Sequence, residues 1–119
     1  MFVYYINVPL NYEGVEEFEA YDEEMKNVKT YELSENEYRV LRKKRGLFDL
    51  FDEKLGTIMD VCEEERSSLN QIPESIIIVQ DYMKRVKNQA EIDICNTVLE
   101  ALQTALKAGT FCEIDIYLE

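Results

Sequence analysis

The apolar residues near the two ends of the chain are patterned as β-strands. Residues 2–8 are β-branched or aromatic with an Asn among them, and Pro9 ends the run. Residues 111–118 alternate between two sets, Cys112, Ile114, Ile116 and Leu118 against Phe111, Glu113, Asp115 and Tyr117. This two-residue period is typical of a strand with one face in the core. Because the two segments share an apolar character, we expect them to pair with each other.

Helix signals dominate the interior of the chain. Ser34 and Glu37 match a capping box, which predicts a helix that runs to about Arg45 and stops at Gly46 in a left-handed conformation. Residues 47–55 and 57–69 then have helical spacing. They are separated by a glycine, so we expect two short helices.

Two further helices are expected in the C-terminal half. Residues 90–108 carry a broad apolar stripe and are followed by Gly109, which predicts a long helix. Pro73 suits the first turn of another helix, although residues 76–79 also fit a buried strand. We favour the helix.

The stretch from residue 11 to residue 30 is ambiguous. Apolar residues recur in it at three- and four-residue steps, at Phe18, Tyr21, Met25 and Val28. This spacing allows a helix, but Gly14 and a weak start signal leave a loop or a strand open. Residues 28–33 offer a short third strand.

Together these patterns predict an α+β fold in which two or three strands, including both chain termini, form a small sheet packed against about four helices. The chain has 119 residues, of which 46% are hydrophobic. This length and composition fit a single globular domain over residues 1–119.

The net charge of the chain limits the classes of molecule that we expect it to bind. Twenty-five Asp and Glu stand against thirteen Lys and Arg, a formal net charge of -12. Binding to nucleic acid or to an anionic membrane surface depends on cationic side chains, so both partners are disfavoured. A basic protein would be attracted, and solubility alone would explain the charge equally well.

The acids are densest in residues 11–30, where seven acids stand against two lysines with aromatic residues among them. Aromatic anchors with a charged rim are common in protein interfaces. The candidate partner-binding residues are Tyr12, Glu13, Glu16, Glu17, Phe18, Glu19, Tyr21, Asp22, Glu23 and Glu24. The alternative is that Phe18 and Tyr21 face the core and the acids face water.

Residues 42–45 are four consecutive cations. In another protein they would suggest phosphate binding. In a chain this acidic, we expect them to stabilise a helix end and to pair with Asp49, Asp52 and Glu53.

Several kinds of catalysis lack their usual residues. The chain has no histidine, which excludes Ser-His-Asp and Cys-His catalysis by this chain alone. Its four glycines form no phosphate-binding pattern, and Cys62, Cys95 and Cys112 form no C-x-x-C pair. We therefore predict no catalytic residue, no metal ligand and no cofactor.

One enzymatic alternative depends on carboxylates. Asp49 and Asp52, and likewise Asp60 and Glu63, are three residues apart, so each pair could share a helix face and hold magnesium. In so acidic a chain such pairs also arise by chance on solvated faces.

These observations lead us to expect a non-enzymatic acidic protein that neutralises a basic protein partner, such as an immunity or inhibitor protein against a nuclease-type toxin. The N-terminal residues lack a signal-peptide pattern and no stretch could span a bilayer, so we expect a cytoplasmic location. A homo-oligomeric structural or regulatory protein is the alternative, and a magnesium-dependent hydrolase is the second alternative.

Overall fold

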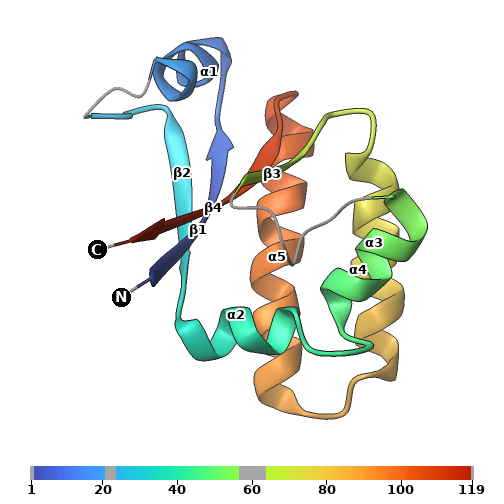
Figure 1. Ribbon diagram of the computed structural model, residues 1–119. Helices are drawn as coiled ribbons and strands as arrows, with labels where there is room; N and C mark the ends of the chain where they lie inside the picture. The colour runs from blue at the N-terminus through green and yellow to red at the C-terminus, as the bar shows by residue number, and fades with distance from the viewer. Residues whose placement is uncertain (1, 21–23, 57–63, 119) are drawn as a thin grey trace.

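The computed structural model describes residues 2–20, 24–56 and 64–118. Within these ranges the chain forms four strands and five helices (Figure 1). In chain order the elements are β1 (Phe2–Pro9), α1 (Tyr12–Glu19), β2 (Val28–Leu33), α2 (Glu35–Leu41), α3 (Leu47–Leu55), β3 (Glu64–Ser67), α4 (Ile72–Arg85), α5 (Gln89–Ala108) and β4 (Cys112–Leu118). The predicted α+β class is confirmed, with both terminal strands in the sheet.

The sheet has the strand order β2-β1-β4-β3, and each neighbouring pair is antiparallel. Ile6 in the centre of β1 lies opposite Tyr31 of β2 and Ile114 of β4. The predicted pairing of the two terminal strands and the third strand over residues 28–33 are therefore confirmed.

The fourth strand, β3, corrects a prediction. We expected a helix over residues 57–69, but the chain is extended at residues 64–67, where it pairs with β4. Residues 57–63 lie outside the described part of the chain. The local sequence of β3 is wholly polar, so its extended form depends on the backbone partner that β4 provides.

The main core lies between the sheet and the helices. Ile6 and Val8 of β1 are fully buried on the core side, as are Phe48 of α3 and Val79 of α4. In Figure 1 the helices α3, α4 and α5 lie on one side of the sheet. Helix α5 contacts β1 and β4, and α4 packs against α5. This arrangement leaves the other face of the sheet to carry polar residues.

Most helix ends follow their predicted signals. The capping box of α2 is present, with 3.1 Å from the Glu37 nitrogen to the Ser34 hydroxyl and 3.0 Å from the Ser34 nitrogen to the Glu37 carboxylate. Gly56 and Gly109 end α3 and α5 with φ of 70° and 71°. Pro73 lies in the first turn of α4, which excludes the strand interpretation there.

The end of α2 differs from its prediction. The helix ends at Leu41 rather than near Arg45. The left-handed residue is Arg45, with φ of 61°, whereas Gly46 has φ of -87° and begins α3. The chain needs glycine at position 46 for space, because a Cβ there would lie 2.8 Å from the carbonyl oxygen of Lys43.

The ambiguous stretch contains one short helix. Helix α1 ends at Glu19, so Phe18, Met25 and Val28 do not form a single helical stripe, and Val28 instead begins β2. Among the described acids of this stretch, Glu24 lies after α1 and the others lie on it.

Candidate functional site

Helix α1 is fixed tightly to the rest of the molecule. Asn11 caps it by accepting a hydrogen bond from the Gly14 nitrogen at 2.9 Å. A Cβ on Gly14 would lie only 2.1 Å from the carbonyl oxygen of Asn27, so the helix backbone packs closely against the residue that precedes β2. Phe18 packs edge-on against Phe111, with 5.6 Å between ring centroids. Both rings are buried, outside the main core cluster.

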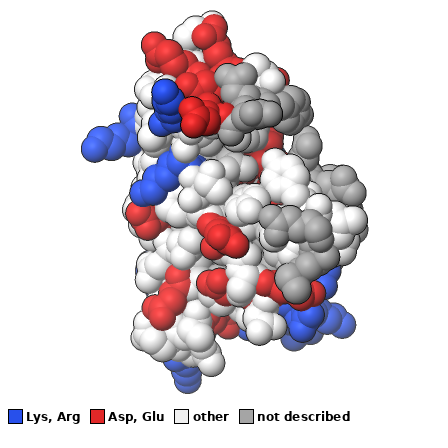
Figure 2. All heavy atoms as spheres, turned by 90° about the vertical axis from the view of Figure 1, so that its left-hand side faces the viewer, with Lys and Arg blue, Asp and Glu red and all other residues white. Residues whose placement is uncertain are grey.

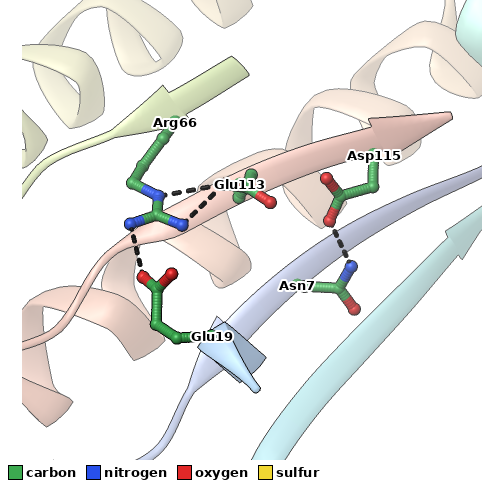
Figure 3. Close-up of polar contacts among 5 residues, drawn as sticks. All are labelled: Asn7, Glu19, Arg66, Glu113 and Asp115. Atoms are coloured by element: carbon green, nitrogen blue, oxygen red, sulfur yellow. Dashed lines mark hydrogen bonds and ion pairs between the residues drawn. The ribbon is translucent and has the colours of Figure 1, made fainter. Parts of the chain in front are cut away.

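Arg66 joins α1 to the edge of the sheet (Figure 3). Its Nε and Nη2 lie 2.9 and 2.8 Å from Oε1 of Glu113, and its Nη1 lies 3.0 Å from Oε1 of Glu19. The guanidinium carbon lies 3.8 Å from the centroid of the Phe111 ring. One side chain of β3 therefore contacts both α1 and β4 through charge and ring packing.

A row of polar residues crosses the sheet on the face opposite the core. Thr30, Asn7, Glu113 and Arg66 are direct cross-strand neighbours on β2, β1, β4 and β3. The Thr30 hydroxyl donates to Oδ1 of Asn7 at 2.7 Å, and Nδ2 of Asn7 donates to Oδ2 of Asp115 at 2.6 Å. All four strands are thus connected by side-chain polar contacts on this face.

Glu113 and Asp115 form a buried carboxyl pair within this row. They are two residues apart on β4 and point to the same face, and only 6% of Glu113 and 1% of Asp115 are exposed. Burial, reinforced by neighbouring Asp115, raises the pKa of Glu113 to about 7, against the opposing effect of Arg66. Oδ1 of Asp115 is buried and has no hydrogen-bond partner among the described residues. A proton on Glu113 would relieve the repulsion between the two groups.

The burial of Glu113 and Asp115 limits the chemistry that this pair could perform. A raised carboxyl pKa suits proton transfer, but side chains this deeply buried present almost no surface to a substrate. No cluster of three or more potential ligands for a metal ion occurs in the described ranges. The contacts of the pair with Asn7 and Arg66 connect β4 to its two neighbouring strands.

Of the predicted partner-binding residues in the described ranges, five are exposed. Tyr12 is 72% exposed, and Glu13, Glu16, Glu19 and Glu24 are exposed as well. Tyr12 and Glu16 are one helical turn apart, as are Glu13 and Glu16, so these three form one surface. We call Tyr12, Glu13 and Glu16 the acidic helix surface. Figure 2 shows acidic side chains gathered at the end of the molecule that carries α1.

Three of the predicted residues have contacts within the molecule. Glu17 accepts two hydrogen bonds from Asn27, both at 2.9 Å, and the backbone one is the main cause that lowers the pKa of Glu17. Phe18 is buried against Phe111, which agrees with the core alternative for that residue. Glu19 pairs with Arg66. Tyr21, Asp22 and Glu23 lie outside the described residues.

The residues considered for enzymatic chemistry are distributed differently. The Asp49 carboxylate accepts a hydrogen bond from the Arg45 nitrogen at 2.7 Å. Asp60, Glu63 and Cys62 lie outside the described residues. Burial raises the pKa of Cys95 to about 11 and that of Cys112 to about 12, so neither thiol is poised as a nucleophile.

The polar row was not predicted from the sequence. Glu113 and Asp115 occupy alternate positions of a terminal strand, and the two-residue period predicts only that one face of that strand lies in the core. The only signal was an uncompensated pair of acids in an otherwise apolar strand, and that signal does not identify Asn7 or Arg66 as their partners.

Comparison with known proteins finds no match to this chain among protein-family models, curated proteins or solved structures. None of the helices in the described ranges is long and apolar enough to cross a membrane.

Proposed function

We propose that this chain is a non-enzymatic binding protein that neutralises a basic protein partner, as an immunity or inhibitor protein does against a nuclease-type toxin. The observation that carries the proposal is the acidic helix surface, where an exposed aromatic ring stands beside two exposed carboxylates. Tyr12, Glu13 and Glu16 are exposed, and neither carboxylate forms an ion pair with a residue in the described ranges. All three side chains are therefore accessible to a partner.

The contacts that hold α1 against the rest of the molecule support a binding role. The Gly14 contact, the Phe18 and Phe111 packing and the Arg66 ion pairs hold the helix in one orientation. A surface that is ordered before association loses little conformational entropy on binding. Rigid acids are also able to occupy positions at which a nuclease would hold phosphate.

The net charge of -12 supports the choice of a basic partner. Long-range attraction raises the rate of encounter with a cationic protein, and it lowers the rate of encounter with nucleic acid. The burial of the carboxyl pair supports a binding protein over a carboxylate enzyme, because a hydrolase needs its acids within reach of substrate.

The proposal is tested by affinity capture from the source cells with three baits. These are the native chain, the charge-reversed variant Glu13→Lys/Glu16→Lys, and the control Glu32→Lys/Glu53→Lys, which reverses two exposed acids away from α1. We expect a basic protein to be retained by the native chain and the control and lost with the α1 variant. A basic partner retained equally by all three baits, or the recovery of no basic protein, would refute the proposal.

Self-association is the second candidate, and one observation favours it. Phe2 and Leu118 are direct cross-strand neighbours on β1 and β4, and they are 54% and 73% exposed. Adjacent exposed apolar side chains at the end of a sheet are a typical contact for a second copy. Sedimentation equilibrium at low and high salt separates the candidates, since an apolar dimer persists in high salt and a Leu118→Glu variant would abolish it.

A further inference from the structure

A surface pocket of about 540 Å³ lies between the α2–α3 connection and the turn that joins α4 to α5. In Figure 1 both connections lie at the end of the molecule opposite α1. Five cations line the pocket, namely Lys43, Lys44, Arg45, Arg85 and Lys87. Five of the thirteen Lys and Arg of a strongly acidic chain thus face one pocket.

Among the described residues that line the pocket, the one acid is Glu91, and it is already engaged. Lys43 Nζ lies 2.7 Å from its Oε1, and the Tyr82 hydroxyl donates to its Oε2. Burial acts to raise the pKa of Glu91, but these two hydrogen bonds outweigh it and lower the pKa. Glu91 therefore stays ionised, and its contacts hold Lys43 and Tyr82 together as one wall of the pocket.

The side chains of the other four cations are not held by an acid that lines this pocket. Lys44, Arg45 and Lys87 form no ion pair with any residue in the described ranges, and Arg85 lies over the Tyr82 ring at 5.8 Å. The pairing that we expected for residues 42–45 is wrong for Lys43, which pairs with Glu91. Arg45 contacts Asp49 through its backbone nitrogen rather than through an ion pair of its side chain. Like charges gathered in this way repel one another, and a bound anion offsets that repulsion.

The backbone at Arg45 is held in an unfavourable conformation beside the pocket. Its φ of 61° is left-handed, which side chains larger than glycine rarely adopt. Two hydrogen bonds secure the turn, one from the Gly46 nitrogen to the Lys43 carbonyl at 2.8 Å and one from the Arg45 nitrogen to Asp49. Backbone strain of this kind is concentrated at active sites, ligand-binding positions and switch regions.

We propose that this basic pocket binds a small organic polyphosphate, a compact molecule that carries two or more phosphate groups. Arginine and lysine are the usual ligands of phosphate, and four cations in addition to Lys43 in one pocket match more than one phosphate group. The apolar part of the lining is half-buried Val86 with the largely buried Tyr82, and an organic group would pack there. The volume lies in the range of small-molecule sites, about 300–1,000 Å³.

The acidic residues beside the pocket limit the size of the anion that it can bind. A neighbouring pocket shares Arg45, Tyr82 and Arg85 but also carries Asp49 and Glu53. A long polyanion such as nucleic acid would extend onto acids of this kind, whereas a compact one remains among the cations. This inference goes beyond the proposed function and does not depend on the acidic helix surface.

The test is calorimetric titration of the intact chain at low ionic strength with three probes, namely adenosine triphosphate, inorganic tripolyphosphate and a short single-stranded oligodeoxynucleotide. We expect saturable one-to-one binding of adenosine triphosphate, with weaker binding of tripolyphosphate, which has no organic group, and of the oligodeoxynucleotide. No saturable binding of adenosine triphosphate would overturn the proposal. Tripolyphosphate or oligodeoxynucleotide binding at least as tight would also overturn it.

Two variants locate the site. Lys44→Gln/Lys87→Gln removes two exposed cations from the pocket, and we expect it to weaken adenosine triphosphate binding about tenfold or more. The control Lys26→Gln/Lys107→Gln makes the same change in net charge at exposed positions elsewhere and should change the affinity by less than about twofold. Equal weakening in both variants would show diffuse electrostatic attraction and would overturn the assignment to this pocket.

Discussion

Glu113 is the residue at which burial and charge oppose each other most directly. It is buried on the polar face of β4 beside Asp115, and Arg66 offsets only part of the cost of ionising it. A carboxyl group with a raised pKa keeps its proton in the folded chain at pH values where the unfolded chain has lost it. The stability that it contributes is therefore fully present below its ordinary pKa of 4.5 and is lost as the pH rises through about 7.

This linkage predicts the behaviour of Glu113→Gln. Between about pH 5 and about pH 8, the free energy of unfolding of the native chain should fall by on the order of 2 kcal/mol more than that of the variant. Urea denaturation at the two pH values measures the difference. A control at an exposed acid, Glu53→Gln, should keep the native pH dependence. Parallel pH curves for the native chain and Glu113→Gln would contradict the prediction.

Gly14 offers a second test at the scale of one residue. Alanine is the better helix former by up to about 1 kcal/mol, so intrinsic propensity alone predicts that Gly14→Ala stabilises α1. The added Cβ would meet the Asn27 carbonyl oxygen at 2.1 Å, and we expect a net loss of about 1–3 kcal/mol. Chemical denaturation measures it, with the exposed substitution Glu13→Ala as the control. A variant as stable as the native chain would show that α1 does not contact Asn27 this closely.

At the scale of the element, Arg66 of β3 forms one ion pair with Glu19 of α1 and a second with Glu113 of β4. The two pairs differ in burial. The Glu19 side chain is 56% exposed, whereas that of Glu113 is 8% exposed. Exposed pairs contribute about 1 kcal/mol or less, but removal of one partner from a buried pair costs about 3–5 kcal/mol.

We therefore expect Glu19→Gln to lower the free energy of unfolding by less than about 1 kcal/mol and Arg66→Met to lower it by about 3 kcal/mol. Loss of Arg66 should also raise the pKa of Glu113 further. Denaturation of the two single variants and the double variant gives the coupling energy directly. Equal effects of the two single substitutions would mean that the Glu113 contact contributes nothing beyond the surface pair.

The elements that were predictable from the sequence are those with strong local signals. The capping box at Ser34 and the αL glycine at Gly109 operate within a few residues of the chain, as does the apolar stripe of α5. Strand β3 has no such signal, because all four of its residues are polar and it is extended only through its pairing with β4.

The site was less predictable for a related reason. Alternation in β4 identifies two faces but not how deeply the polar face is buried, so the burial of Glu113 and Asp115 was not predictable from the sequence. Likewise, the sequence shows that Glu17 and Glu19 are acidic but not that Asn27 and Arg66 lie within reach of them. Both failures concern contacts between residues far apart in the chain.

At the scale of the whole molecule, the charge of -12 acts against folding as well as for recognition. Bringing like charges together in a compact state is unfavourable, and dissolved salt screens that repulsion. The structure contains exposed ion pairs as well, which salt weakens, but these are individually worth little.

We therefore expect the thermal midpoint of unfolding to rise by a few degrees when sodium chloride is increased from about 0.02 M to about 0.5 M. The variant Glu13→Lys/Glu16→Lys has a smaller net charge and should respond less. Choline chloride serves as the control for specific binding of sodium. A midpoint that falls with salt would mean that the ion pairs outweigh the net repulsion.

The acidic helix surface and the basic pocket lie at opposite ends of a molecule whose longest extent is 38 Å. Such a separation gives the protein an electric polarity, so a cationic surface would turn the α1 end toward itself during approach. The pocket would then be on the trailing side, away from the interface. A small anion could therefore enter or leave while the larger complex stays intact, and the two binding events would not compete for the same space.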